Sequence, residues 1–556
     1  MEAATRSAGG TTYCNPLNLD YTYVVHSDPS YRSGADPAVV SFRGEYYMFV
    51  TRSMGYWHSK DLTRWTFITP QRWYFQGCNA PAAHNYRDEM LYVAGDPSNN
   101  MSLLYTDDPR KGDWKAVPAV LHGVRDPAFF IDDDGRAYMF WGSSAKLPLQ
   151  GYELDPRRRF LPRSEPVELF NLDAAKHGWE RFGENHNHPT LGGYIEGAWL
   201  TKHGGRYYMQ YAAPGTEWDT YADGVYIADH PLGPYRYAPH NPISYKPGGF
   251  INGAGHGSTV QGPGGQLWHF ATMAIAVNFP FERRLAMFPI FFDGDGVMHC
   301  RTDYGDYPHY APSAPGRPGE FTGWMLLSYK KPVRASSHLG DHTADRANDE
   351  KVKTFWVAKT NAAGQWLEID LEKVMTVRAF QINYHDYEAD IYGRQEGLHH
   401  RYVVESSLDG ATWTVLKDKT GERTDTPHDY VELPAPVTAR LVRFKHGHVP
   451  TPRLAVSGFR IFGRGPGVAL PAVTGLKIAR GEDRRNALLT WRPQPGRQGC
   501  NVRWGIAPDK LYSSWLVYDD SVLVLRSLNT DQEYYFTVEA FDENGISPPS
   551  AVLKVP

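Results

Sequence analysis

The sequence is poor in cysteine, with only four in a chain of 556 residues: Cys14, Cys78, Cys300 and Cys500. The four lie far apart and form no Cys-x-x-Cys pair. A cysteine-based zinc site or a disulfide framework is therefore not expected. We predict four free or buried thiols.

The sequence also lacks a run of about 18 apolar residues, so no helical membrane span is expected. The first ten residues (MEAATRSAGG) contain no apolar stretch of the kind found in a secretory signal peptide. We expect a secreted or periplasmic protein whose signal peptide is absent from this sequence. A cytoplasmic protein is the alternative.

An excess of charge of one sign is missing as well. The formal net charge is −4 at pH 7, and acidic and basic residues are interspersed along the chain. A nucleic-acid-binding protein usually carries a basic patch or stripe. No nucleic-acid partner is therefore expected, and no pattern in the sequence indicates an oligomeric state.

Aromatic residues, by contrast, are abundant at 14%, including 35 Tyr and 16 Trp. They favour β-strands, and their flat rings also stack on the apolar faces of sugars, so composition alone leaves both interpretations open. A chain of 556 residues is too long for one hydrophobic core. Its length predicts three or four domains.

An alternating, aromatic-rich strand that begins at a Gly or Asp turn recurs five times in the N-terminal part of the chain. Self-similarity of this kind is typical of repeat architectures such as β-propellers. The five strands are Gly44–Val50, Asp88–Gly95, Gly135–Gly142, Gly205–Ala212 and Gly265–Thr272.

A short segment, here named the lead-in, precedes each of these strands. The lead-ins are Ala35-Asp-Pro-Ala38, Asn79-Ala-Pro-Ala82, Arg125-Asp-Pro-Ala128, Ile195-Glu-Gly-Ala198 and Gly255-His-Gly-Ser258. A four-stranded blade needs about 40–50 residues, so this spacing predicts a five-bladed β-propeller over residues 12–311, with an insertion at 143–193. The alternative, an antiparallel sandwich of hairpins, does not require matched lead-ins.

The innermost strands of a propeller surround one centre, so the five lead-ins should converge there. Three of them carry an acid: Asp36, Asp126 and Glu196. The fifth carries His256, and the second carries only Ala80 beside Asn79. Three neighbouring carboxyl groups should have pKa values driven apart. Hydrolysis of a glycosidic bond needs one ionised carboxylate and one protonated carboxyl group.

Together with Asn15-Pro-Leu17, these lead-ins resemble glycoside hydrolase family 43 over about 300 residues. The resemblance implies an inverting hydrolase in which Asp36 is the general base, Glu196 the general acid and Asp126 the residue that tunes and orients the acid. His256 matches a central histidine that lies near a metal ion or a water; a structural histidine is the alternative. An inverting enzyme needs its catalytic carboxyl groups about 6.5–9.5 Å apart.

The predicted function is an inverting exo-glycosidase that removes terminal pentofuranosyl or pentopyranosyl residues from plant polysaccharides. An α-L-arabinofuranosidase, a β-D-xylosidase or an enzyme with both activities is expected, with an oligo- or polysaccharide as substrate and no cofactor required for the chemistry. The alternatives are a β-galactofuranosidase or galactan-active hydrolase of the same fold, a retaining transferase, and a non-catalytic glycan-binding protein.

Further residues are candidates for contact with the sugar, each with packing as the alternative. They are Tyr56 and Trp57 after the first repeat strand, Trp218 after the fourth, and Arg284 after the fifth. The 143–193 insertion also carries Glu184, His186 and His188. A solvated loop is the favoured interpretation for these three.

The character of the sequence changes after residue 311. Residues 326–464 resemble a discoidin (factor V/VIII type C) domain, with Gln365–Leu371 and Ser406–Trp413 among the matching segments. In hydrolases such jelly-roll sandwiches often bind carbohydrate and often hold calcium, for which Asp345, Asn348 and Asp349 are candidate ligands. The alternative is a polar loop without metal.

The last segment, residues 472–556, resembles a fibronectin type III module. Trp491 fits the buried tryptophan of such a module, and Tyr534–Ala540 fits its tyrosine-corner strand. We expect a spacer without chemistry. The predicted fold class is therefore all-β: a five-bladed propeller, then a jelly-roll sandwich, then an immunoglobulin-like (fibronectin III) sandwich.

Overall fold

The computed structural model describes residues 11–24, 29–72, 75, 78–96, 103–117, 123–189 and 192–555. In these ranges the regular structure consists of β-strands and short 3₁₀ turns, so the predicted all-β class is confirmed. No helix in this part of the chain is long and apolar enough to cross a membrane. The first ten residues, on which the expected compartment rests, lie outside the described residues.

Five antiparallel sheets follow one another in the described part of the N-terminal region, each with its strands in up-and-down order. Their strands are β4 (Ala38–Phe42), β5 (Glu45–Phe49), β6 (Tyr56–Ser59), β7 (Trp65–Ile68); β8 (Ala82–Tyr86), β9 (Met90–Ala94), β10 (Leu104–Thr106), β11 (Lys115–Ala116); β12 (Ala128–Ile131), β13 (Ala137–Trp141), β14 (Leu149–Asp155), β15 (Leu161–Pro162), β16 (Val167–Phe170); β17 (Glu196–His203), β18 (Arg206–Ala213), β19 (Ala222–Ala228), β20 (Arg236–Tyr237); and β21 (Asn252–Gln261), β22 (Leu267–Ala274), β23 (Arg283–Phe292), β24 (Met298–Cys300).

The first strands of these sheets form a closed ring. Strand β4 contacts β8, β8 contacts β12, β12 contacts β17, β17 contacts β21, and β21 contacts β4 again. A ring of radial four-stranded sheets is the geometry of a β-propeller. The five repeat strands of the sequence are the second strands of the blades: β5, β9, β13, β18 and β22.

Each lead-in contains a residue in the left-handed backbone region, which lies before or near the start of the inner strand in four blades and within β21 in the fifth. The φ values are 56° at Asp36, 40° at Ala80, 47° at Asp126 and 44° at His256, and in the fourth blade Gly197 takes this role at 68°. Such a conformation is uncommon outside glycine. It occurs at the second residue of four lead-ins and at the third residue of the other, so all five lead-ins contain a similar bend.

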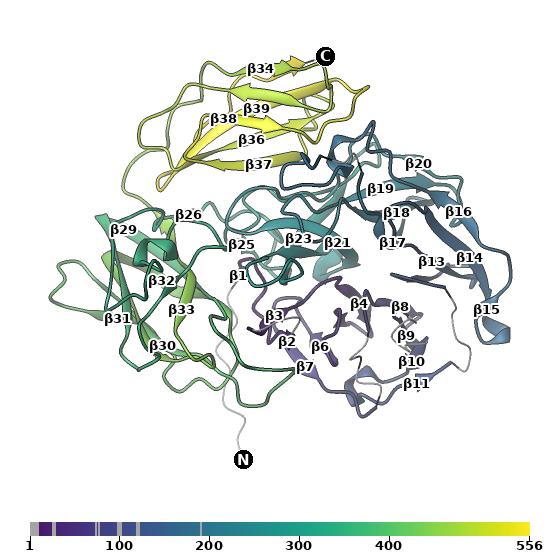
Figure 1. Cartoon of the computed structure of the whole chain (residues 1–556), viewed down its shortest axis with the longest axis horizontal. Helices are drawn as coiled ribbons and strands as arrows, with labels where there is room; N and C mark the ends of the chain where they lie inside the picture. Colours follow the sequence, from purple (N-terminus) through teal and green to yellow (C-terminus); the bar gives the residue numbers. More distant parts are fainter. Residues whose placement is uncertain are drawn as a thin grey trace.

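The second domain is one large twisted sheet system with a core of its own. Its strands are β26 (Met325–Leu326), β27 (Val333–Ala335), β28 (Trp356–Val357), β29 (Trp366–Tyr384), β30 (Arg401–Ser407), β31 (Thr414–Asp418), β32 (His428–His448) and β33 (Ala455–Arg464). In Figure 1 this domain lies beside the start of the chain, near β1 (Thr12–Tyr13), β2 (Thr22–Val24) and β3 (Tyr31–Ser33).

The third domain is a two-sheet sandwich. One sheet contains β34 (Lys477–Arg480), β35 (Ala487–Thr490) and β38 (Val522–Leu525), and the other contains β36 (Gly499–Gly505), β37 (Ser513–Tyr518), β39 (Tyr534–Asp542), β40 (Gly545–Ile546) and β41 (Leu553–Val555). Figure 1 shows it above the fourth and fifth blades. The hydrophobic core of this sandwich continues into the fourth blade: Trp491 and Phe536 belong to the same buried cluster as Trp179 and Tyr211.

Candidate functional site

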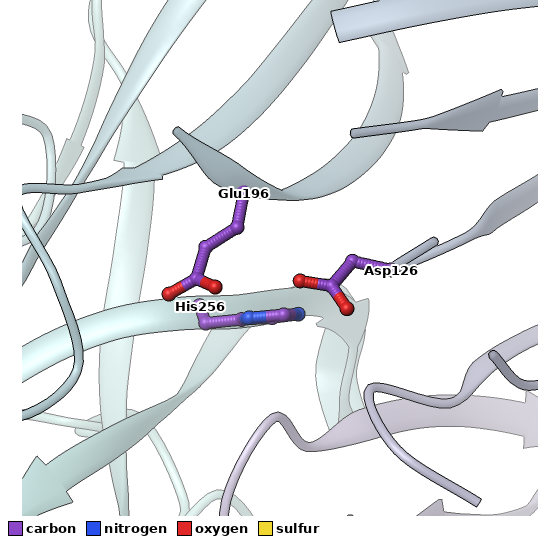
Figure 2. Close-up of side chains that lie close together, drawn as sticks. All are labelled: Asp126, Glu196 and His256. Atoms are coloured by element: carbon purple, nitrogen blue, oxygen red, sulfur yellow. The ribbon is translucent and has the colours of Figure 1, made fainter. Parts of the chain in front are cut away.

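The inner strands bring three lead-in side chains together at the centre of the propeller. Ligating atoms of Asp126, Glu196 and His256 all lie within 4.8 Å of one another, and Figure 2 shows the two carboxyl groups directed toward the imidazole ring. Asp36 joins them, because its Oδ1 lies 3.3 Å from Nδ1 of His256. The predicted convergence of the lead-ins is therefore seen in the structure.

Asp36 is held in an environment that favours its charge. Its backbone N–H donates to Oγ1 of Thr272 at 2.8 Å, and Thr51 donates from Oγ1 to its Oδ2 at 2.5 Å. Burial raises the pKa of this carboxyl group, but the nearby His256, the Arg283 guanidinium and the Thr51 hydroxyl outweigh it, so the pKa is lowered. Asp36 is an ionised carboxylate at neutral pH.

Glu196, by contrast, lies in an environment that favours its protonated form. Burial first, and then the negative charge of Asp126, raise its pKa to about 8, although His256 and a short hydrogen bond from the Tyr221 hydroxyl favour the ionised form. Glu196 begins β17 at an irregularity in its pairing with β18. The next residue must be glycine, because its φ is positive and a Cβ there would lie 2.9 Å from Cγ of His256.

The pKa of Asp126 lies between those of Asp36 and Glu196. Burial raises its pKa to about 6; His256 and a hydrogen bond from Ser143 oppose this rise, and the Asp36 charge adds to it. The three carboxyl groups therefore have separated proton affinities, as expected for like charges that share one site.

The buried carboxylate of Asp223 fixes the backbone at His256. Asp223 on β19 accepts the backbone N–H of His256 at 2.7 Å and that of Gly257 at 2.9 Å, and it also lies 3.1 Å from Nε2 of the buried His269. Burial lowers the pKa of the His256 imidazole, but Asp36, Asp126 and Glu196 outweigh burial and raise it. The carboxyl groups around it therefore favour the cationic form of the imidazole.

Arg283 is a site residue that the sequence analysis missed. Its NH1 lies 3.7 Å from Oδ1 of Asp36 and donates to Oγ1 of Thr216 at 3.0 Å. Its Nε is buried and has no hydrogen-bond partner among the described residues. A buried donor without a partner calls for an explanation, and a substrate hydroxyl would supply one.

The structure places the predicted Arg284 elsewhere. Side chains alternate along a strand, so Arg284 on β23 points away from Asp36. It is buried and donates from Nε to Nε2 of His428 at 2.9 Å, in the second domain. The signal in the sequence was the Arg-Arg pair, and only the register of β23 shows which of the two faces the centre.

Tyr56 and Trp57 do not line the site either. The Tyr56 side chain is fully buried and donates from its hydroxyl to the carbonyl of Pro109 at 2.5 Å, while the ring packs on Trp114. Trp57 is buried as well and donates to Oδ1 of Asp20 at 2.6 Å. Packing, the alternative considered for both, is what the structure shows.

Trp218 is half-buried in the loop that leads to Tyr221, whose N–H donates to the Trp218 carbonyl at 3.1 Å. Its ring lies against Phe182 and His188, with centroid distances of 6.4 and 6.0 Å. In the described part of the chain no group pairs with its buried Nε1. Trp218 is therefore still a candidate for substrate contact.

The insertion residues have mixed surroundings. His186 is buried, with hydrogen bonds from its ring to the Arg181 carbonyl and the Tyr245 hydroxyl, which makes it structural. Glu184 is exposed and accepts the backbone N–H of Asp219 at 2.9 Å. His188 is exposed.

Two of the candidate calcium ligands of the second domain, Asn348 and Asp349, form hydrogen bonds within the chain. The amide nitrogen of Asn348 donates to the carbonyls of Ser328 and Lys331, and Asp349 accepts from Thr354 and from the Lys351 backbone. These bonds leave the Asn348 side-chain oxygen and Asp345 as candidate ligands, and calcium binding stays a prediction. Within the described ranges, the one cluster of acidic, His or Cys side chains close enough to share an ion is Asp126, Glu196 and His256.

A cation at that cluster would lower the pKa of Glu196 by charge attraction. Such a shift would oppose a protonated Glu196 at neutral pH. The geometry is thus compatible with an ion, whereas the proton affinities suit proton transfer better. The expected metal or water near His256 stays a prediction.

Comparison with known proteins agrees with this geometry. Residues 30–298 match the family model described as "Glycosyl hydrolases family 43", and residues 332–451 match "F5/8 type C domain". The propeller thus carries a family 43 glycosyl hydrolase domain, and an F5/8 type C domain follows it.

Two curated relatives match part of the chain. One is "Xylan 1,3-beta-xylosidase" of a Vibrio species, 28% identical over 270 residues that cover 42% of this chain and 47% of the relative. The other is "Putative beta-xylosidase" of Escherichia coli, 28% identical over 268 residues that cover 42% and 46%. The match spans less than half the length of both relatives.

Among solved structures, xylan beta-1,4-xylosidase from Bacillus halodurans is 14% identical, with a TM-score of 0.41, and the match covers 97% of this chain and 96% of that one.

Proposed function

We propose that this protein is an inverting, exo-acting glycoside hydrolase that removes terminal pentosyl residues, with Asp36 as general base and Glu196 as general acid. The observation that carries the proposal is the opposite ionisation of two carboxyl groups at one centre. Asp36 has a lowered pKa and Glu196 a pKa of about 8. At neutral pH one accepts a proton from water while the other still has a proton to donate.

The chemistry is a single displacement. Asp36 accepts a proton from a water molecule, whose oxygen attacks the anomeric carbon. Glu196 donates its proton to the glycosidic oxygen as the bond to the leaving group breaks. Afterwards Asp36 is protonated and Glu196 ionised, and proton exchange with solvent restores both.

The remaining site residues support these two roles. Asp126 keeps Glu196 protonated through its negative charge, and Tyr221 orients the acid by its hydrogen bond. His256, with its raised pKa, and Arg283 keep Asp36 ionised. The unpaired Nε of Arg283 is available to a sugar hydroxyl.

The substrate class is a β-D-xyloside or an α-L-arabinofuranoside. Both curated relatives carry names that contain xylosidase, and the resemblance to family 43 implies mainly pentosides. The 143–193 insertion adds Phe182 and His188 beside Trp218 on the side of the acid. Exo action is part of the proposal because an insertion of this size usually closes a groove into a pocket.

The third domain is a fibronectin type III module in this proposal. Its Tyr534 hydroxyl accepts the backbone N–H of Asn529 at 2.9 Å, which is the hydrogen bond of a tyrosine corner. Trp491 is buried in its core. Binding of glycan or calcium by the F5/8 type C domain stays a prediction.

The test is a panel of 4-nitrophenyl glycosides: α-L-arabinofuranoside, β-D-xyloside and β-D-galactofuranoside. We expect hydrolysis of at least one pentoside, and NMR of the first-formed sugar should show the inverted anomer. Asp36→Asn and Glu196→Gln should each lower kcat/KM about 10²–10⁴-fold. Unchanged hydrolysis in both variants would refute the roles, and a wild type inert on the whole panel would favour a glycan-binding protein.

A further inference from the structure

Arg284 connects the two segments that carry Asp36 and Arg283 to the second domain. Its NH1 donates to the carbonyl of Arg32 at 2.5 Å and to the carbonyl of Arg283 at 3.0 Å. Arg32 lies on β3, just before the lead-in that contains Asp36, and Arg283 begins β23. A third link joins the same segments, since the N–H of Gly34 donates to the Arg283 carbonyl at 3.1 Å.

The other face of the Arg284 guanidinium is held by the second domain. Nε donates to Nε2 of His428 at 2.9 Å, and NH2 lies 3.4 Å from Oδ2 of Asp386. Asp386 also binds the buried Arg32 side chain, whose NH2 contacts Asp425 at 2.6 Å. All of these charged groups are buried, so the interface fixes them in one arrangement.

His428 has the tautomer that this arrangement needs. Its Nδ1 lies 2.9 Å from Oδ1 of Asn383 and donates to it, which leaves Nε2 free to accept from Arg284. Burial, with the positive charges of Arg284 and Arg32, holds the pKa of His428 well below its usual range. The imidazole is therefore a neutral acceptor.

Loss of the Arg284 contacts would affect the candidate active site. The pairing of β23 with β22 sets the register in which Arg283 faces Asp36, and Arg284, on the opposite face of the strand, ties the start of β23 to the Arg32 segment. If the second domain releases Arg284, both the Arg32 carbonyl and the Arg283 carbonyl lose a donor. The Arg283 guanidinium, 3.7 Å from Asp36, would then keep its bond to Thr216 but lose the support that the Arg284 bonds give its backbone.

We propose that the F5/8 type C domain is part of the catalytic unit, and that His428 and Asp386 act through Arg284 as positioning residues for Arg283 beside Asp36. The proposal rests on the proposed function for its kinetic readout, but the placement of Arg283 can be observed without it.

The decisive pair of variants is His428→Leu and His428→Gln. Leucine removes the acceptor for Arg284, whereas the Gln side-chain oxygen can occupy the position of Nε2. We expect about a tenfold loss of kcat/KM on the best 4-nitrophenyl pentoside for His428→Leu, and a value within about threefold of wild type for His428→Gln. Arg284→Lys, which keeps the charge but cannot form the same set of bonds, should resemble His428→Leu and replaces it if that variant does not fold.

A double-mutant cycle with Arg283→Ala tests whether His428 acts on catalysis through Arg283. If His428 acts through Arg283, adding His428→Leu to Arg283→Ala causes no further loss. Tyr430→Phe is the matched control: Tyr430 lies on the same strand and interface, but its hydroxyl bonds to Thr12 at 2.7 Å and not to Arg284. It should leave kcat/KM unchanged.

Crystal structures of wild type and His428→Leu give a readout that does not depend on activity. We expect the Arg283 guanidinium to leave Asp36 in the variant. An unmoved Arg283, or equal losses from His428→Leu in both backgrounds of the cycle, would overturn the proposal. A wild type that hydrolyses no glycoside would instead overturn the proposed function and leave the structural comparison to decide this one.

Discussion

The three carboxyl groups at the propeller centre differ in their neighbours more than in their burial. Asp36 faces His256 and Arg283, whereas Glu196 faces Asp126. Positive neighbours favour ionisation and a negative neighbour favours the proton. The roles of base and acid therefore follow from which lead-in side chains lie next to each other at the propeller centre.

Asp126→Asn and Tyr221→Phe should move the alkaline limb of the pH profile in opposite directions. Activity requires protonated Glu196 and is lost as pH rises through its pKa of about 8. Removing the Asp126 charge lowers that pKa, so the limb moves to lower pH; removing the Tyr221 hydrogen bond raises it, so the limb moves to higher pH. Asparagine tolerates the left-handed backbone at this position.

The measurement for this pair is kcat/KM from about pH 4 to 10 for wild type and both variants. Shifts in the same direction would contradict the assignment of Glu196 as the acid. The acid limb, which reports Asp36, should move less in Tyr221→Phe than the alkaline limb.

The sequence could identify the carboxyl groups but not the arginine. Asp36, Asp126, Glu196 and His256 stand at one position of a repeat, so repetition alone brings them to one centre. Arg283 has no repeated counterpart. Its neighbour Arg284 was the expected residue, and the choice between them depends on where β23 begins.

At the scale of the strand, both faces of a blade are covered by neighbouring blades. All four residues of β6 are buried, for example. Alternation along such a strand cannot show which aromatic side chain reaches a substrate, and this is why Tyr56 and Trp57 were candidates from sequence and core residues in the structure.

Tyr56→Phe should therefore affect stability and not substrate binding. The change removes the donor to the Pro109 carbonyl and the acceptor of the Trp114 indole N–H. A buried polar group left unpaired costs about 1–3 kcal/mol, so we expect a lower melting temperature with KM unchanged. Tyr221→Phe makes the same chemical change at the site and should alter the pH profile instead. An increase in KM for Tyr56→Phe would place this ring at the sugar after all.

At the scale of the whole molecule, the three domains share buried surface that the sequence did not predict. From the sequence, a solvated loop was expected for the polar residues of the 143–193 insertion, and a spacer for the last domain. In the structure the insertion docks on the last domain: Gly178 N–H donates to the Leu528 carbonyl at 2.9 Å, and Arg181 lies 3.2 Å from Asp483. Contacts between distant segments have no local pattern, so periodicity could not reveal them.

This docking predicts one cooperative unfolding transition for the propeller and the C-terminal sandwich, and Gly178→Ala should split it. A Cβ at Gly178 would lie 2.5 Å from the Arg526 carbonyl oxygen and 2.7 Å from that of Leu528, and backbone atoms cannot move aside without separating the domains. The hydrophobic cluster that joins Trp179 to Trp491 would then be exposed in part to water. In calorimetry the variant should show an additional transition at lower temperature, from the C-terminal sandwich.

Gly481→Ala, in the same sandwich, is the control, because a Cβ there meets nothing within 4 Å, and its melting curve should match that of wild type. A single unshifted transition for Gly178→Ala would show that the two domains do not depend on this contact for their stability.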